Sequence, residues 1–382
     1  MKTTGEKISK YFKYTDRLLW LLIIALNTLS LLLIASMQRA GEYNYLRTQS
    51  IALCIGIAGA FALSVIDYKF LRKFWWLAAT AGIGLIGIVF IYGIRVEGTD
   101  DVAWINVGGF SLQPSEIVKV CFIVTLSAHL SALMKSGKIT DFFNVCLLAV
   151  HGAVPALLIH FQGDDGSALI FVLIFAVMTF CAGVQLRYYL GVAAAAALSI
   201  PFVWTRVLNN DQRNRFMVLL NLDENAKSVY GWQQYQGKLS IVSGGYKGEG
   251  LFQGKRVGYA IVPEQENDFI FTVAGEELGF IGCCIILLLF LVLVLRIFYK
   301  SANARDEFGQ NLCIGVFALI LSQVSVNLGM VLGFLPVVGV TLPFFSAGGT
   351  SLMVLMFCIG IVQSVHYYSS DERLIIKPHN DD

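Results

Sequence analysis

The sequence predicts an all-α polytopic membrane protein with about ten transmembrane helices. Of its 382 residues, 56% are hydrophobic and only 14% are charged, and the mean hydropathy is +0.68. A soluble domain carries about a quarter charged residues. Apolar runs of about 18 to 25 residues recur along the chain, and a helix of that length spans the hydrocarbon core of a bilayer. Lipid offers the backbone no hydrogen-bond partners, so the spans must be helices.

We expect a single integral-membrane domain over residues 1–382. The spans are predicted near 18–36, 48–66, 75–94, 116–134, 143–161, 167–184, 188–206, 269–296, 311–335 and 350–368. A large loop, 207–267, separates the seventh and eighth spans. Prolines and glycines interrupt the apolar stretch before the tenth span, and broken backbone at this depth must be buried in protein or line a polar cavity. We therefore expect Pro336 to Gly349 to form a re-entrant segment.

The distribution of positive charge predicts the orientation of the spans. Cytoplasmic loops carry an excess of Lys and Arg, and an even number of spans places both termini on one side. That side holds Lys69, Lys138 and Lys300 among many others, whereas the opposite short loops hold few basic residues. We expect cytoplasmic tails at 1–17 and 369–382 and an extracytoplasmic loop at 207–267.

Cysteine and histidine positions indicate no metal centre. All eight cysteines fall within predicted spans, where they are unavailable for an outer disulfide or a zinc site. The five histidines show no H-x-x-x-H or H-E-x-x-H spacing. The net charge of +2 gives no sign of a nucleic-acid partner, and we expect none.

The fourth span begins with two residues of opposite charge. In "DVAWINVGGFSLQPSEIVK", residues 101–119, Ser115 is typical of a helix N-cap, which places Glu116 and Lys119 on one helix face. A capped helix with a local ion pair would explain the pattern. However, the Lys119 charge lies well within the span, and intramembrane ionisable residues are functional by default.

Further polar residues gather in the loops on the same face. The turn "FQGDDGSALIF", 161–171, contains Asp164, which by itself is most typical of a helix cap. The long loop contains a glycine-rich tract at 244–254 beside Lys255 and Arg256. Its spacing and context do not fit a dinucleotide fold. We expect a flexible loop whose backbone can approach a ligand.

Carboxylates crowd at the start of the eighth span, in "PEQENDFIFTVAGEELGF", residues 263–280. Asp268 immediately precedes the apolar run, a position typical of an N-cap. The same position suits a reactive carboxylate at the membrane surface, and the two roles are compatible.

These motifs together closely resemble the SEDS family, which includes RodA, FtsW and SpoVE, over essentially the whole chain. "WINVGGFSLQPSEIVK" is similar to the family's W-I…G…QPSE…K, "PEQENDFIFTVAGEELGF" to PEAHTDFIFA-GEELG, and "GFLPVVGVTLPFFSAGGTS" to G-LP-TG-LPF-SYGGSS. The resemblance implies ten transmembrane helices and a peptidoglycan glycosyltransferase that polymerises lipid II on the outer face of the bacterial cytoplasmic membrane. It also implies a class B penicillin-binding protein as partner, in elongation, division or sporulation.

The resemblance also assigns roles by position. Asp268 matches the catalytic aspartate, and the other matching positions are Trp104, Glu116, Lys119, Asp164, Arg215 and Ser346. The sequence departs from the family pattern at Ala103, Gly163, Glu266 and Lys255–Arg256, positions that bear on the subfamily and the donor contacts more than on the chemistry.

A glycosyl transfer needs a base for the acceptor hydroxyl and positive charge for the departing pyrophosphate. Asp268 is the expected base, and Lys119, Arg215, Lys255 and Arg256 are the candidate cations. A divalent cation, Mg²⁺ or Mn²⁺, held by Glu116 or Asp164 could share this work, although nothing in the sequence requires one. The rival hypothesis is a flippase or transporter of a lipid-linked precursor, because broken helices and an intramembrane lysine also suit transport.

Overall fold

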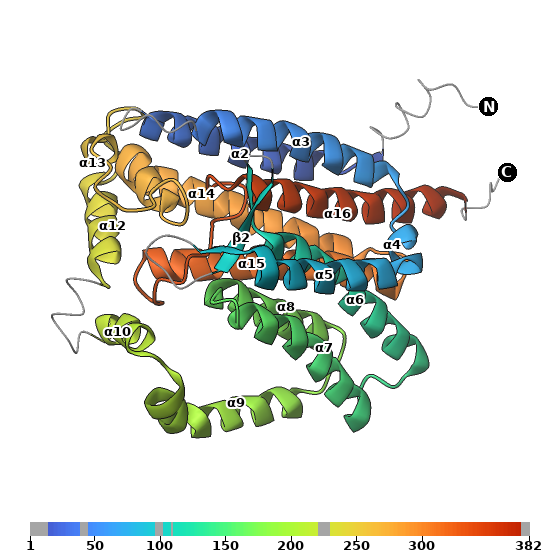
Figure 1. Cartoon of the computed structure of the whole chain (residues 1–382). Helices are drawn as coiled ribbons and strands as arrows, with labels where there is room; N and C mark the ends of the chain where they lie inside the picture. The colour runs from blue at the N-terminus through green and yellow to red at the C-terminus, as the bar shows by residue number, and fades with distance from the viewer. Residues whose placement is uncertain (1–13, 39–44, 96–101, 108–109, 221–229, 376–382) are drawn as a thin grey trace.

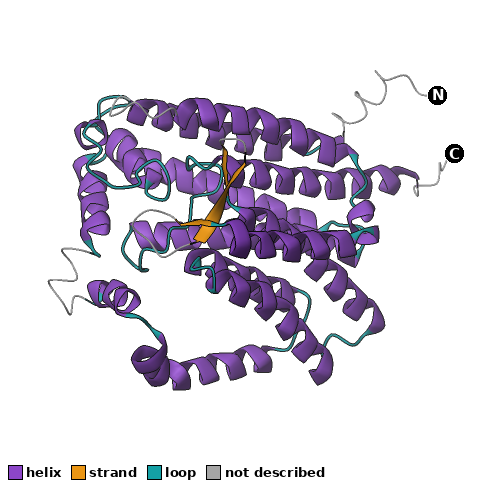
Figure 2. Ribbon diagram, in the orientation of Figure 1, coloured by secondary structure: helices purple, strands orange, loops and turns teal. Residues whose placement is uncertain are grey.

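The computed structural model describes residues 14–38, 45–95, 102–107, 110–220 and 230–375, and most of these are helical (Figures 1 and 2). The helices are α2 (Arg17–Met37), α3 (Tyr45–Val65), α4 (Lys69–Lys73), α5 (Trp75–Tyr92), α6 (Pro114–Ser136), α7 (Phe142–His160), α8 (Asp165–Cys181), α9 (Leu186–Phe202), α10 (Asn210–Leu219), α12 (Trp232–Ser243), α13 (Lys255–Gly258), α14 (Ile270–Ala302), α15 (Glu307–Val331) and α16 (Gly349–Ile375). A small antiparallel sheet joins β1 (Ile94–Arg95), β2 (Val102–Val107) and β3 (Phe110–Leu112).

The predicted spans correspond to these helices. Among the described residues, nine helical segments are long and apolar enough to cross a membrane, and the seventh span combines α9 with a π-helical turn at Val203–Val207. The remaining predicted span, 167–184, corresponds to α8, an apolar helix of 17 residues. The all-α multi-pass prediction is therefore confirmed. Most of the two tails and residues 221–229 of the long loop lie outside the described residues.

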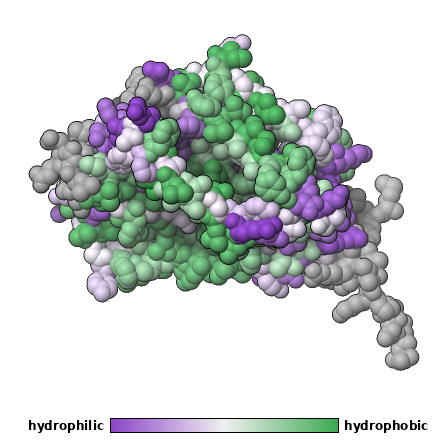
Figure 3. Space-filling model, turned by 90° about the horizontal axis from the view of Figure 1, so that it is seen from below, coloured by the Kyte–Doolittle hydropathy of each residue, from purple (hydrophilic) through white to green (hydrophobic). Residues whose placement is uncertain are grey.

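Apolar side chains cover the outside of the helical bundle as well as its interior. Leu21, Ile83 and Ile91 are more than 60% exposed, although each lies in a span. Figure 3 shows large apolar areas on one face, with hydrophilic residues gathered toward its ends. This distribution fits a surface surrounded by lipid rather than by water.

The centre of the bundle is formed by α15 and α16, whose spans are the most buried of the candidates. The longest helix pairing is between α3 and α16, where a Cβ on Gly360 would collide with the backbone of Ala60. Small residues allow this close approach between transmembrane helices. By contrast, α9 has no buried residue and lies apart at the edge of the molecule (Figure 1).

The start of α2 lies beside the last turns of α14 and the C-terminal half of α16. The carboxylate of Asp16 accepts hydrogen bonds from Arg296 Nε at 2.7 Å and Lys300 Nζ at 2.5 Å, and its backbone N–H donates to Gln363 Oε1 at 3.0 Å. The chain therefore enters and leaves the bundle at the same end. The starts of α6, α8, α14 and α16 lie at the opposite end, where α12 and α13 run across the helices (Figure 1).

Candidate active site

Asp268 lies in a tight turn directly before α14. The carbonyl of Glu264 accepts hydrogen bonds from the backbone N–H groups of Asn267 and Phe269, at 3.1 and 3.2 Å. Glu264 itself has a φ of 52°, and such strained residues are frequent at functional sites. The N-cap of α14 is Phe269 and no side chain caps the helix, so the interpretation of Asp268 as an N-cap is wrong.

The environment of Asp268 is suited to a general base. Its side chain is largely buried, and burial raises its pKa to about 7, with a further rise from the negative charges of Glu264 and Glu266. A hydrogen bond with its own backbone opposes this rise. A base is most effective when its pKa is close to the working pH.

The segment 332–348, between α15 and α16, is non-helical and contacts the Asp268 turn, α10 and the start of α8. Its contacts run from the Ala347 N–H to the Glu266 carbonyl (2.8 Å), from Arg215 Nη1 to the Val337 carbonyl (2.9 Å), and from Gly166 at the start of α8 to the Val338 carbonyl. Residues 342–346 of the segment are buried, whereas Leu332, Phe334, Leu335 and Gly339 are exposed. Its depth in the membrane stays a prediction.

Ser346 lies within this segment and is 5% exposed. Its Oγ accepts a hydrogen bond from the Leu342 N–H at 2.8 Å, and its carbonyl accepts one from Gln49 Nε2 at 2.9 Å. Both groups therefore shape the turn itself, and a contact of Ser346 with substrate stays a prediction.

Glu116 and Lys119 form a buried ion pair on α6. Lys119 Nζ lies 2.7 Å from Glu116 Oε1, and the two side chains are 2% and 6% exposed. The other carboxylate oxygen, Glu116 Oε2, is buried without a hydrogen-bond partner among the described residues. The expected ion pair is confirmed. Its unsatisfied oxygen is costly, which is more typical of a site that receives another group than of a purely structural pair.

Asp164 caps α8 and links it to α6. Its Oδ1 accepts from the Ser167 N–H at 2.8 Å, while Oδ2 accepts from Gln113 Nε2 at 2.9 Å and from Ser115 Oγ at 3.3 Å. The cap interpretation of Asp164 is therefore confirmed. Ser115, in contrast, is not the N-cap of α6: the helix begins at Pro114 with Gln113 as N-cap, and proline suits the first turn because it needs no N–H partner there.

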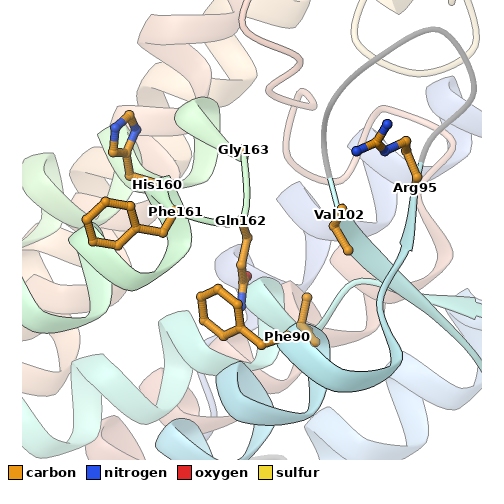
Figure 4. A pocket seen from close by; sticks show the side chains of 8 residues that line it. Phe90, Arg95, Val102, His160, Phe161, Gln162 and Gly163 are labelled. Carbon is orange, nitrogen blue, oxygen red and sulfur yellow. The ribbon is translucent and has the colours of Figure 1, made fainter. Parts of the chain in front are cut away.

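Trp104 lies on β2, which packs beside the turn that precedes Asp164. The Val102 N–H donates to the Gln162 carbonyl at 2.9 Å. A pocket of about 510 Å³ opens between this hairpin, α5 and the end of α7, lined by Arg95, His160 and Phe161 among others (Figure 4). Trp104 does not line this pocket. Gln162 does, and its Nε2 donates a hydrogen bond to the Ile86 carbonyl at 3.0 Å.

Arg256 and Lys255 on α13 are held differently from the other candidates. Arg256 donates to Ser240 Oγ at 2.9 Å and to Gln236 Oε1 at 2.5 Å, both on α12, while Lys255 is exposed. Glu276 Oε1 accepts from the backbone N–H groups of Arg256 and Val257, at 2.6 and 3.2 Å. Arg256 thus clamps α13 to α12, and a phosphate contact of either cation stays a prediction.

The glycine-rich tract is packed against α14 rather than free in the loop. At Gly279 (φ 66°) α14 is interrupted, so the next N–H groups lose their helical acceptors. Phe280 and Ile281 donate instead to the carbonyls of Gly245 and Tyr246, at 2.9 and 3.2 Å. In return, the Glu276 and Glu277 carbonyls accept from the N–H groups of Glu249 and Gly250, at 2.9 and 3.1 Å. The expectation of a flexible loop is therefore wrong.

No group of three or more His, Cys, Asp or Glu side chains within the described part of the chain could hold a metal ion. Glu116 and Asp164, the two expected carboxylates, are already bonded to protein groups. Mg²⁺ is often bound by only one or two carboxylates together with substrate phosphates. The residues present therefore do not build a complete protein site, and the cation stays an expectation.

The family of the chain follows from comparison with known proteins. The family described as "Cell cycle protein", which groups FtsW, RodA and SpoVE, matches residues 15–371. The chain belongs to this family. It is 36% identical over 324 residues to a protein of Geobacter metallireducens named "Probable peptidoglycan glycosyltransferase FtsW", with 85% of each chain covered.

Two further likenesses extend this result. The chain is 32% identical over 376 residues to "Stage V sporulation protein E" of Bacillus subtilis, with 93% of this chain and 97% of the relative covered. A solved structure described as "Structural coordination of polymerization and crosslinking by a peptidoglycan synthase complex" contains a chain with a TM-score of 0.80 and 26% identity. The match covers 93% of this chain and 98% of that one.

Proposed function

We propose that this protein is a peptidoglycan glycosyltransferase that polymerises lipid II on the outer face of the cytoplasmic membrane. The observation that carries the proposal is the buried carboxyl of Asp268, whose pKa of about 7 matches the requirement for a base. The names of the family relatives support the same chemistry. The concentration of basic residues at the opposite end of the bundle supports an extracytoplasmic site.

The reaction joins two sugars and releases a lipid pyrophosphate. Asp268 accepts the proton of the acceptor C4 hydroxyl. The oxygen of that hydroxyl forms a bond to the anomeric carbon of the donor. The bond between that carbon and the pyrophosphate oxygen breaks, and the lipid pyrophosphate leaves with the electron pair. Positive charge at this end of the bundle would stabilise the leaving group.

Two features supply that charge. Lys119 is a buried cation whose carboxylate partner keeps one oxygen unsatisfied. The N-termini of α6, α8, α14 and α16 lie at this same end, and helix N-termini favour anions through their free N–H groups and dipoles. Arg215, Lys255 and Arg256 are the further candidates, and Trp104 and Ser346 are proposed contacts of the sugar-peptide part.

We also propose a class B penicillin-binding protein as partner, since a solved structure similar to this chain is described as "Structural coordination of polymerization and crosslinking by a peptidoglycan synthase complex". A divalent cation bound by Glu116 or Asp164 together with the substrate pyrophosphate is a separate proposal. Activity that is lost in EDTA and restored by Mg²⁺ or Mn²⁺ would support it, and unchanged activity in EDTA would reject it.

An assay with purified protein in vesicles and lipid II distinguishes polymerisation from transport. The proposal predicts glycan chains from lipid II supplied on the outer side, without net movement of lipid between leaflets. Translocated lipid without glycan chains would instead support the flippase hypothesis.

A further inference from the structure

A fully buried asparagine on α15 joins the turn that carries Asp268 to the segment 332–348. Asn327 Nδ2 donates hydrogen bonds to the carbonyls of Asp268 and Val340, both at 2.7 Å. Its side chain is 0% exposed. An amide nitrogen has two hydrogen atoms, so both bonds can form at once.

This bridge acts on the backbone of the reactive residue itself. Asn327 fixes the Asp268 carbonyl. Two residues earlier in the chain, the Glu266 carbonyl accepts a hydrogen bond from the Ala347 N–H at 2.8 Å. Both segments contain a residue with positive φ, Glu264 at 52° and Phe344 at 61°. Two irregular loops are therefore held against each other, and regular secondary structure cannot supply that restraint.

We propose that Asn327 is a positioning residue, which fixes the backbone of Asp268 so that its carboxylate stays enclosed and aimed at the acceptor hydroxyl. This inference rests on the proposed function, because it assumes that Asp268 is the base. Asn327 acts through Asp268 and does not itself touch the reacting atoms.

The composition of the bridge supports a role beyond stability. Asn327 Oδ1 is buried and has no hydrogen-bond partner among the described residues. An apolar side chain of the same shape would avoid that cost. This position therefore uses the two N–H donors of asparagine. Both donate to carbonyls of irregular backbone at the site.

Loss of the bridge should change how Asp268 titrates. Burial is the largest cause of its raised pKa, so a turn that admits water should lower the pKa toward the ordinary carboxyl value. The charged groups that act on Asp268 are Glu264 and Glu266 in the same turn, and Lys238 of α12 reaches the segment 332–348 beside Gly333. The segment 332–348 and the outer half of α15 carry no charged residue, so an apolar residue at 327 leaves the surrounding charges unchanged.

The test is the pH dependence of lipid II polymerisation by Asn327→Leu in the full-length protein. Activity should rise as Asp268 loses its proton, with a midpoint near pH 7 in the wild type. In the variant, kcat should fall about 10- to 100-fold with little change in KM, because misplacement of a reacting group by about 1 Å is that costly. The midpoint should also move at least about one unit to lower pH.

Gln49→Met is the matched control. Gln49 is a buried amide that also makes two hydrogen bonds to the segment, to the Ser346 carbonyl at 2.9 Å and from the Gly348 N–H at 3.2 Å, but it does not contact the Asp268 turn. A substitution that only destabilises the fold lowers polymerisation by the same factor at every pH, because less of the protein is folded. The midpoint of the pH profile then stays in place. We expect that result for Gln49→Met.

An unmoved midpoint in Asn327→Leu, or an equal movement in Gln49→Met, would overturn the proposal. If Asn327→Leu does not fold, Asn327→Ser provides the same readout, because serine is too short to reach either carbonyl and leaves room for water. Asp268→Asn in the same assay separates the role of Asp268 from that of Asn327. An active Asp268→Asn protein would reject Asp268 as the base. An inactive Asp268→Asn protein, together with an unchanged pH profile in Asn327→Leu, would reject only the positioning role of Asn327.

Discussion

At the scale of single residues, the site combines buried charges whose desolvation is costly. A buried ion pair such as Glu116–Lys119 often contributes no net stability, because removal of two charges from water offsets their attraction. The pair is therefore poorly explained by stability. In the proposed reaction, a buried cation near the start of α6 would stabilise a pyrophosphate, because electrostatic interactions are stronger away from water.

Lys119→Met should lower lipid II polymerisation at least about 100-fold, since removal of one such electrostatic contact typically costs about 3 kcal/mol. Because Glu116 is then left buried without its partner, thermal stability should also fall, so activity is compared per amount of folded protein. The control is the double variant Glu116→Gln with Lys119→Met, which removes both charges. Recovery of activity in the double variant would mean that Lys119 serves only to neutralise Glu116.

At the scale of elements, specific hydrogen bonds stabilise the interruption of α14 at Gly279. The loop 244–250 supplies donors and acceptors to the turns of α14 on both sides of Gly279. The same part of α14 provides Glu276, which holds the backbone of α13. The loop, the kink and α13 thus form one unit next to the Asp268 turn. A substitution that disrupts the loop should therefore destabilise the whole unit.

Two glycines of this loop offer a matched comparison. Both have positive φ, 79° at Gly248 and 53° at Gly245, but a Cβ at Gly248 would collide with the Glu277 carbonyl whereas one at Gly245 meets open space. A non-glycine residue in this conformation costs about 1–2 kcal/mol, and overpacking adds about 1–3 kcal/mol. Gly248→Ala should therefore lower the Tm several degrees more than Gly245→Ala. Equal shifts in thermal unfolding would contradict the packing seen here.

At the scale of the whole molecule, the alternation of helices places the site and the termini at opposite ends. The α2 start bonds to the last turns of α14 and the C-terminal half of α16, and the polar loops converge where α6, α8, α14 and α16 begin. Positive charge at the terminal end predicts that this end is cytoplasmic.

Cysteine labelling with an impermeant reagent tests this orientation. Tyr259 is 81% exposed beside the site, and Lys138 is exposed in the turn between α6 and α7. Tyr259→Cys should react in intact cells, and Lys138→Cys only after lysis. The reverse pattern would invert the topology and reject an outer active site.

The sequence was sufficient to predict the spans, because hydrophobic length is a property of local composition. It also predicted the Glu116–Lys119 pair, since residues three apart share a helix face. It did not predict that Asp268 precedes the cap or that the glycine tract pairs with α14. Those features depend on contacts between segments far apart in the chain.

Asn327 and Gln49 were missed for the same reason. Each is a single amide within an apolar span, and its role becomes visible only when the segment 332–348 folds back onto it. A polar residue inside a predicted span was the available signal. The hydrogen bonds of the Arg256 side chain to α12 were likewise not predicted from its charge.

The effect of Asp268 on stability provides a check of folding. Because its pKa is raised in the folded protein, the folded state keeps a proton that the unfolded state loses between about pH 4 and pH 7. Stability therefore falls as pH rises through this window. Asp268→Asn should raise the Tm at pH 8, and the gain should shrink toward pH 4.

The central claim is that Asp268 is the base for glycosyl transfer, and the polymerisation rate of Asp268→Asn tests it most directly. Asparagine is nearly isosteric, and Phe269 rather than Asp268 caps α14, so the variant should fold and insert normally. General-base catalysis is worth about 10²- to 10⁴-fold. We predict that the folded variant makes no detectable glycan from lipid II, whereas polymerisation at more than about a tenth of the wild-type rate would contradict the claim.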